Sequence, residues 1–302
     1  MRIGLTGGTG FIGQYLIRDY SSEFEFVAPT SRKDFSGLEQ GCEYIASDYS
    51  KSSFLRVFDG CDAVIHLGSQ VMHGLDAAIE PGVYLPNIPL ANDVFSACRE
   101  LGIKNIVNAS SVAVYQQINE RPTVETDPCY PNSVYGIMKI TVEKLAALYN
   151  AKYDMAIKSL RYGQGIGWNP RHKANGFWGI LLDHCVSGSP IPIWGEGRTG
   201  RDVIYVKDMA YAAICAVGHP EARGEYNIGT QHICSNREIA EIYCVVFHNE
   251  AGLTFVPNTK EPGIRTCMDC SKAARELGYT AQYTIRQAVE DIYRERLLQI
   301  EK

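Results

Sequence analysis

The sequence predicts an α/β protein in which a doubly wound parallel sheet carries helices on both faces and a smaller C-terminal lobe follows. In the first half of the chain, short apolar runs alternate with segments whose apolar residues recur at helical spacing. Buried strands separated by helices form right-handed crossovers and therefore pair in parallel. From residue 163 to 200 the chain is rich in Gly, Pro and Trp, and this alternation stops. The change predicts a second structural unit.

The expected elements follow in chain order. The first half contains the strands expected at 2–6, 24–30, 43–46, 63–67, 105–109 and 156–161. After the loop-rich segment come strand-like runs at 203–206 and 226–228 and helical patterns near 236–248, 271–278 and 284–298. We therefore assign residues 1–165 to the sheet domain, which residues 202–230 rejoin, and residues 166–302 mainly to the lobe.

Composition and charge narrow the function classes. With 45% hydrophobic and 21% charged residues, the chain can bury an ordinary globular core. Its net charge of −5 gives no electrostatic reason to expect binding to nucleic acid or an anionic membrane. No apolar run approaches the ~20 residues that span a bilayer. The first residues enter a strand pattern rather than a signal-peptide pattern, so we expect a cytoplasmic protein.

The cysteines do not predict a metal site. There are ten, and only Cys267 and Cys270 have CxxC spacing. A zinc site would need a second pair or a nearby His, and neither lies at ligand spacing. We expect reduced thiols that pack as small hydrophobic groups.

A glycine-rich loop follows the first expected strand and opens the first expected helix. Gly7 allows a tight turn, Gly10 lets backbone N–H groups approach a pyrophosphate, and Gly13 lets helix and strand pack closely. The helix N-terminus adds unpaired N–H groups and a positive dipole end. This placement predicts a Rossmann-type dinucleotide-binding domain, with cofactor contacts at Gly7, Thr9, Gly10, Phe11, Ile12 and Gly13.

The end of the second strand leaves the form of the dinucleotide open. An Asp or Glu there would bind the 2′-hydroxyl of NAD, but the chain has Ser31, Arg32 and Lys33, and Asp34 comes late. The two cations either hold the 2′-phosphate of NADP or form a solvated charged loop. Further cofactor contacts are expected after the third and fourth strands, at Asp48, Tyr49, Leu67 and Gly68.

Tyr135 and Lys139 lie four residues apart near the start of an expected helix, on one face. Lowering the pKa of a tyrosine from about 10 to near neutrality takes roughly 4 kcal/mol. A close, poorly solvated ammonium and a positively charged nicotinamide ring would both favour tyrosinate. Ser110 and Ser111 follow an apolar run at the carboxyl end of a strand, where ligands bind in open parallel sheets. We therefore expect Ser111, Tyr135 and Lys139 to be catalytic.

Taken together, these motifs resemble the extended short-chain dehydrogenase/reductase family, the NAD-dependent epimerases and dehydratases. The likeness covers nearly the whole chain in order, and within the family it is greatest to nucleotide-sugar 4-epimerases such as UDP-galactose and UDP-N-acetylglucosamine 4-epimerases. It is carried by residues 6–13, 111–115, 135–139, 160–162, 201–208, 226–229 and 269–273.

The resemblance implies roles for particular residues. Tyr135 would be the acid/base, Lys139 would bind the nicotinamide ribose and depress the pKa of Tyr135, and Ser111 would be the hydroxyl partner. Asn87 matches a family Asn near the active site, and Arg201 matches the arginine that binds the substrate diphosphate. The family also implies a homodimer that packs helices at 89–101 and 135–150 into a four-helix bundle.

The chain also departs from the family pattern. Gln164 replaces the usual Asn, and Lys260 stands about where the family has a second diphosphate-binding Arg, with a point charge in place of a planar fork. Val112 and Ala113 follow Ser111, whereas the 4,6-dehydratases carry an acid there. Aromatic residues of the lobe either stack on a nucleobase or fill its core, and core is expected for most of Trp168, Phe177, Trp178 and Trp194.

Our leading hypothesis is a nucleotide-sugar 4-epimerase that oxidises C4 transiently and returns the hydride to the other face. An NADPH-dependent 4-keto-sugar reductase would use the same Ser, Tyr and Lys, and Arg32 favours it. A non-catalytic dinucleotide sensor ranks lower, because both Tyr135 and Lys139 are present. We expect NAD for the epimerase, with NADP left open by Arg32.

Overall fold

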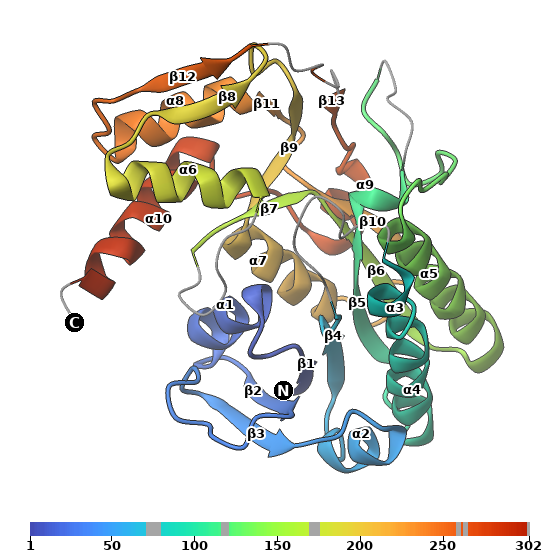
Figure 1. Ribbon diagram of the computed structural model, residues 1–302. Coiled ribbons are helices and arrows are strands. Elements are labelled where there is room, and N and C mark those ends of the chain that lie inside the picture. Colours follow the sequence, from blue (N-terminus) through green and yellow to red (C-terminus); the bar gives the residue numbers. More distant parts are fainter. Residues whose placement is uncertain (71–79, 116–120, 169–175, 258–260, 262–264, 301–302) are drawn as a thin grey trace.

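A computed structural model describes residues 1–70, 80–115, 121–168, 176–257, 261 and 265–300 (Figure 1). Its main sheet has seven parallel strands in the order β10-β6-β5-β4-β1-β2-β3. Their bounds are β1 Arg2–Thr6, β2 Glu25–Thr30, β3 Cys42–Ala46, β4 Ala63–His66, β5 Asn105–Ser111, β6 Ala156–Tyr162 and β10 Gly224–Ile228. Every residue of β4 and β6 is buried, because helices cover both faces. The predicted doubly wound α/β fold is confirmed.

Two layers of helices enclose this sheet (Figure 1). On one face, α1 (Phe11–Tyr20) packs against α7 (Val206–Val217). On the other face lie α2 (Lys51–Val57), the short α3 (Pro81–Tyr84), α4 (Asn87–Glu100) and α5 (Val134–Tyr153). The sheet thus separates two apolar clusters of buried residues.

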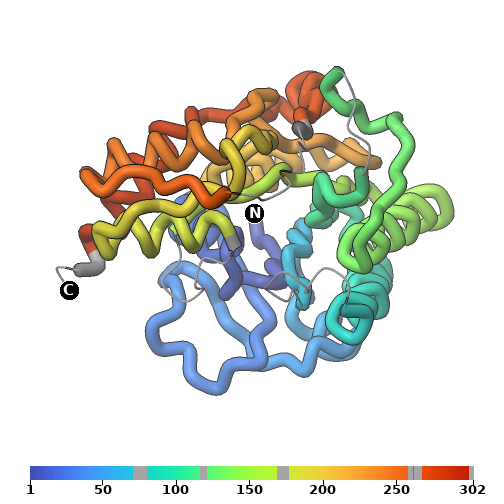
Figure 2. Tube along the Cα trace, turned by 45° about the horizontal axis from the view of Figure 1, so that its top comes forward, coloured from blue at the N-terminus to red at the C-terminus, as the bar shows by residue number. Residues whose placement is uncertain are grey.

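The C-terminal lobe packs along one end of the main sheet, as the yellow to red segments of Figure 2 show. A second sheet joins β11 (Ile233–Ser235), β9 (Gly200–Tyr205), β13 (Arg265–Thr266) and β7 (Gln164–Ile166). A two-stranded sheet pairs β8 (Ile191–Trp194) with β12 (Leu253–Val256). The helices of the lobe are α6 (Gly176–Ser187), α8 (Asn236–Val246), α9 (Ser271–Leu277) and α10 (Ile285–Ile300).

Two features of the lobe differ from the sequence analysis. The segment 163–200 keeps regular elements, namely β7, α6 and β8, where we expected the alternation to stop. The two strands are only three and four residues long. The helix is apolar on most of its sides, so it shows little periodicity. The expected strand near 203–206 lies in the second sheet as β9, whereas the expected strand near 226–228 is the edge strand β10 of the main sheet.

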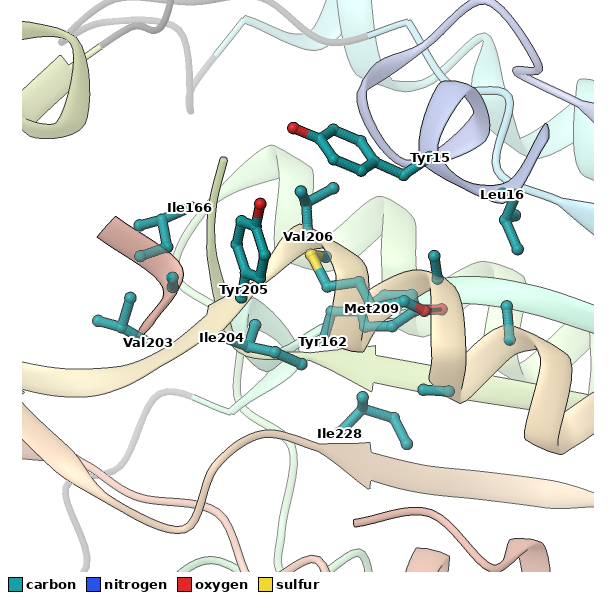
Figure 3. Packing of buried hydrophobic residues seen from close by; sticks show 14 of the residues in the cluster. Tyr15, Leu16, Tyr162, Ile166, Val203, Ile204, Tyr205, Val206, Met209 and Ile228 are labelled. Carbon is teal, nitrogen blue, oxygen red and sulfur yellow. Dashed lines mark hydrogen bonds between the residues drawn. The ribbon is translucent and has the colours of Figure 1, made fainter. Parts of the chain in front are cut away.

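One continuous core joins the main sheet to the lobe (Figure 3). Tyr15 and Leu16 of α1 pack near Tyr205 and Met209, which come from β9 and α7. The hydroxyl of Tyr162, the last residue of β6, donates to the backbone oxygen of Met209 at 3.1 Å. Because β7 begins two residues after β6 ends, the lobe starts at the carboxyl edge of the main sheet.

Candidate active site

The glycine loop between β1 and α1 has the geometry of a phosphate cradle. Gly7 has a φ of +75°, and the N–H of Gly10 donates to its carbonyl at 2.8 Å. A Cβ on Gly13 would lie 2.2 Å from the same oxygen, so a side chain there would displace α1 from the loop. No side chain caps the N-terminus of α1. Its first N–H groups can therefore donate to an anion, and the loop fits a dinucleotide pyrophosphate.

The segment after β4 is fixed against the glycine loop through Thr6. The N–H of Gly68 donates to Thr6 Oγ1 at 3.0 Å, and the N–H of Leu67 donates to the Thr6 backbone oxygen at 3.2 Å. Thr6 Oγ1 lies 2.7 Å from His66 Nδ1. Burial, reinforced by the charge of Lys139, lowers the pKa of His66 to about 3. His66 is therefore a neutral imidazole that is hydrogen-bonded to the threonine hydroxyl.

Asn87 begins α4 and is buried, with its amide bonded to neighbouring backbone. Its Oδ1 accepts from the N–H of Gln70 at 2.6 Å, and its Nδ2 donates to the carbonyls of Gln70 and Tyr84. Asn87 thus holds the chain that continues from Gly68. Direct contact of this amide with the cofactor stays a prediction.

Acidic groups near the expected adenosine end are engaged within the protein. Asp34 accepts from the backbone N–H and the hydroxyl of Ser36. One oxygen of Asp48 accepts from the Ser50 and Ser53 hydroxyls at 2.7 and 2.6 Å, and these hydrogen bonds lower the pKa of Asp48. Arg32 is exposed directly after β2. A cation rather than a carboxylate therefore stands nearest the end of this strand.

Tyr135, Lys139 and Ser111 come together where β5 ends against the first turns of α5. Ser133 caps this helix by accepting from the N–H of Gly136 at 3.0 Å. The hydroxyl of Ser111 lies near enough to the Tyr135 phenol to act on its pKa. The Nζ of Lys139 lies 5.7 Å from the centroid of the Tyr135 ring and donates to the carbonyl of Ala109 at 2.8 Å.

The surroundings of this cluster shift two pKa values. Burial raises the pKa of Tyr135, and the nearby hydroxyl of Ser111 opposes that rise. Burial lowers the pKa of Lys139 to about 8, against the opposing charge of Glu143. That Lys139 depresses the pKa of Tyr135 stays a prediction, and a positively charged ligand would add to such an effect.

Sequence analysis missed a buried polar network beneath this cluster. The hydroxyl of Ser110 donates to Glu143 Oε1 at 2.5 Å. Arg161 on β6 binds both oxygens of the same carboxylate, at 2.9 and 2.7 Å. The hydroxyl of Tyr115 accepts from Arg161 and donates to Asn227 on β10. Glu143 lies one helical turn beyond Lys139, and this spacing was the sequence feature that pointed to a polar partner beneath the cluster.

Two of the expected substrate residues, Gln164 and Arg201, lie on the second sheet. Gln164 on β7 pairs with Val203 of β9, two residues beyond Arg201. Arg201 is partly buried, and burial lowers the pKa of its guanidinium. Lys260 lies outside the described residues. Of the four lobe aromatic residues named in the sequence analysis, Trp168, Phe177 and Trp178 pack against the core, whereas Trp194 is 41% exposed.

Comparison with known proteins gives the same class. A nucleotide cradle followed by Ser, Tyr and Lys at the carboxyl edge of a parallel sheet defines a dinucleotide-dependent α/β enzyme. The model of the NAD dependent epimerase/dehydratase family matches residues 3–229. The chain therefore belongs to this family, whose structures have the extended short-chain dehydrogenase/reductase fold.

Individual relatives cover nearly the whole chain. An uncharacterized UDP-glucose epimerase of Bacillus subtilis (strain 168) is 27% identical over 96% of both proteins. The crystal structure of UDP-N-acetylglucosamine 4-epimerase from Bacillus cereus is 27% identical, with a TM-score of 0.87 over 100% of this chain and 97% of that one. The UDP-glucose 4-epimerase of Thermus thermophilus, solved in complex with NAD, is 25% identical, with a TM-score of 0.82 over 97% and 99%.

The described residues contain neither a metal-binding cluster nor a membrane-spanning helix. No three His, Cys, Asp or Glu side chains in this part of the chain come together as a metal site. None of its helices combines the length and apolar composition that a bilayer crossing requires. All ten cysteines lie in the described part and are free thiols.

Proposed function

We propose that this enzyme is a nucleotide-sugar 4-epimerase, acting on a UDP-linked hexose. The observation that carries this proposal is the grouping of Ser111, Tyr135 and Lys139 at the carboxyl edge of the sheet. Support for the sugar comes from the relatives, which are named as UDP-glucose and UDP-N-acetylglucosamine epimerases. Residues 1–165 would bind the cofactor and residues 166–302 mainly the substrate.

In this proposal the phenol of Tyr135 takes the proton of the C4 hydroxyl, and the hydroxyl of Ser111 orients the same oxygen. A nicotinamide bound at this edge of the sheet would supply hydride transfer, from C4 and back to the other face of the sugar. Lys139 supplies a positive charge beside the ribose. Arg201, Gln164 and Lys260 would hold the diphosphate while the 4-keto sugar turns. Tyr135 then returns the proton.

The residues after Ser111 favour epimerisation over dehydration. Loss of water between C5 and C6 requires an acid and a base beside the sugar, and Val112 and Ala113 offer neither. A second candidate, an NADPH-dependent 4-keto-sugar reductase, is favoured by the exposed Arg32 at the end of β2. The same Ser, Tyr and Lys would serve it.

The deciding experiment supplies purified protein with UDP-glucose, UDP-N-acetylglucosamine or dTDP-glucose and follows products by NMR. An epimer formed without net change in the NAD(H) absorbance supports the proposal. Stoichiometric loss of NADPH on a 4-keto sugar would support the reductase, and bound dinucleotide without turnover on any of these sugars would support a sensor. Tyr135→Phe should lower turnover by about 10²–10⁴-fold yet bind NAD. Tyr226→Phe, which removes a phenol bonded to Glu276, serves as the matched control.

A further inference from the structure

The end of β5 is tied to one face of α5 by three consecutive strand residues. Ala109 accepts from Lys139 Nζ, Ser110 donates to Glu143, and the hydroxyl of Ser111 lies beside the phenol of Tyr135. On the helix these partners stand at positions 135, 139 and 143, one turn apart and therefore on one face. Two of the three ties involve the proposed catalytic groups directly.

The hydrogen bond between Ser110 and Glu143 is the most deeply buried of the three contacts. Glu143 is 0% exposed and Ser110 is 3% exposed. In the parallel pairing of β5 with β6, Ser110 stands opposite Arg161, so both side chains face α5 from adjacent strands. Arg161 neutralises the carboxylate through a bidentate ion pair. The carboxylate therefore has a fixed position, and Ser110 is held by it.

We propose that Ser110 and Glu143 are positioning residues for the active site. Their hydrogen bond fixes where the carboxyl end of β5 lies along α5. It therefore also fixes the distance from Ser111 to Tyr135 and from Ala109 to Lys139. Ser110 precedes Ser111, so a shift of the strand end moves the Ser111 hydroxyl relative to Tyr135. The inference rests on the proposed function for its kinetic readout, and on dinucleotide binding for an independent one.

Charge adds a second consequence. The Glu143 carboxylate opposes the effect of burial on the pKa of Lys139. Other titratable groups around Lys139 and Tyr135 are His66 on β4, Tyr84 on α3 and Arg161 on β6. His66 is neutral, and Arg161 is charged because an arginine does not lose its proton in proteins. Removing the carboxylate charge should therefore let the pKa of Lys139 fall further.

Ser110→Ala is the sharpest test, because it removes one hydrogen bond and leaves the ion pair intact. We expect kcat to fall about tenfold with KM nearly unchanged, since small misplacements of reacting groups cost rate. The Kd for NAD should rise about two- to tenfold, the value of one hydrogen bond. Ser110→Thr retains the hydroxyl and should restore both.

Tyr115→Phe is the matched control, because it loses hydrogen bonds at the far end of the same network. It should lower the melting temperature while kcat and the Kd for NAD stay near wild type. The inference is overturned when folded Ser110→Ala keeps both values, or when Tyr115→Phe changes them equally. If wild type turns over no sugar, the proposed function fails, whereas the NAD measurement still decides the positioning role.

Glu143→Gln tests the charge separately. A glutamine can accept the bond from Ser110, so the strand end should stay in place. We expect the alkaline limb of the NAD-binding profile to move to lower pH. If the folded variant keeps the wild-type pH dependence of NAD binding, Glu143 does not act on the pKa of Lys139. If the variant does not fold, the carboxylate is required for the fold, and Ser110→Ala decides the positioning role.

Discussion

The ammonium of Lys139 donates to the carbonyl of Ala109 at 2.8 Å, one residue before the buried Ser110. This bond fixes a charged side chain where the carboxyl end of β5 meets α5. The lysine thus has two effects, anchoring the strand end and placing a positive charge beside the expected ribose site. Only the second effect depends on its protonation, because a neutral amine still has N–H groups to donate to the carbonyl.

Affinity for NAD should therefore weaken as pH rises past about 8, the value to which burial lowers the pKa of Lys139. Below that pH the ammonium is charged and can hold the ribose; above it the charge is lost. Isothermal titration between pH 6.5 and 9.5 measures the effect. Lys139→Arg, which stays charged throughout this range, should show a flat profile. A wild-type profile as flat as that of the variant would contradict the assignment.

The lowered pKa of Lys139 also makes the stability of the folded protein depend on pH. The unfolded lysine keeps its proton up to the ordinary pKa of 10.5, whereas the folded one loses it near 8. Between these values the unfolded chain binds more protons, so this group makes the protein more stable as pH rises. Loss of NAD affinity above pH 8 would thus not reflect unfolding caused by Lys139.

Gly13→Ala should disrupt the glycine loop. The new Cβ would lie 2.2 Å from the carbonyl of Gly7, so α1 must move and its N-terminal N–H groups with it. We expect a loss of about 1–3 kcal/mol in the free energy of unfolding and a large loss of NAD affinity. Gly218→Ala is the control, since its Cβ would make ordinary contact at 3.4 Å. Retained NAD affinity in Gly13→Ala would argue against a dinucleotide at this loop.

Arg32 should decide how well NADP binds. Arg32→Ala removes the cation at the end of β2, and a charge-assisted hydrogen bond to a 2′-phosphate contributes about 1.5–3 kcal/mol, so NADP affinity should fall about 10–100-fold. NAD affinity should change little. Lys51→Ala, which loses an exposed cation paired with Glu100 on α4, controls for net charge. Equal NADP affinity of Arg32→Ala and wild type would mean that Arg32 belongs to a solvated charged loop and does not bind the 2′-phosphate.

A homodimer should form through α4 and α5. Several apolar side chains of this region are exposed, among them Ile137, Leu148 and Tyr153 on α5. Light scattering should give twice the chain mass of 33.5 kDa. Leu148→Lys should shift the protein toward monomer, whereas Leu298→Lys, at an equally exposed leucine of α10, should not. A monomeric wild type would refute this proposal.

Sequence analysis succeeded where structure depends on neighbours in the chain. Strand, glycine loop and helix follow one another within residues 2–20, and Tyr135 and Lys139 share a helix turn. Buried parallel strands are visible as short apolar runs, and their carboxyl ends lie at a common edge. Fold class, cofactor loop and the Tyr and Lys pair were predictable for this reason.

Other features depended on which strands become neighbours. Ser110 meets Glu143 and Arg161 because β5 lies between β4 and β6 and α5 crosses above them, a register that no local spacing encodes. Burial then directs Lys139 to a carbonyl and raises the pKa of Tyr135, because desolvation depends on everything packed around a group. Residue spacing alone predicted which groups the candidate active site contains, whereas the packing of three separate segments decided how they are held and charged.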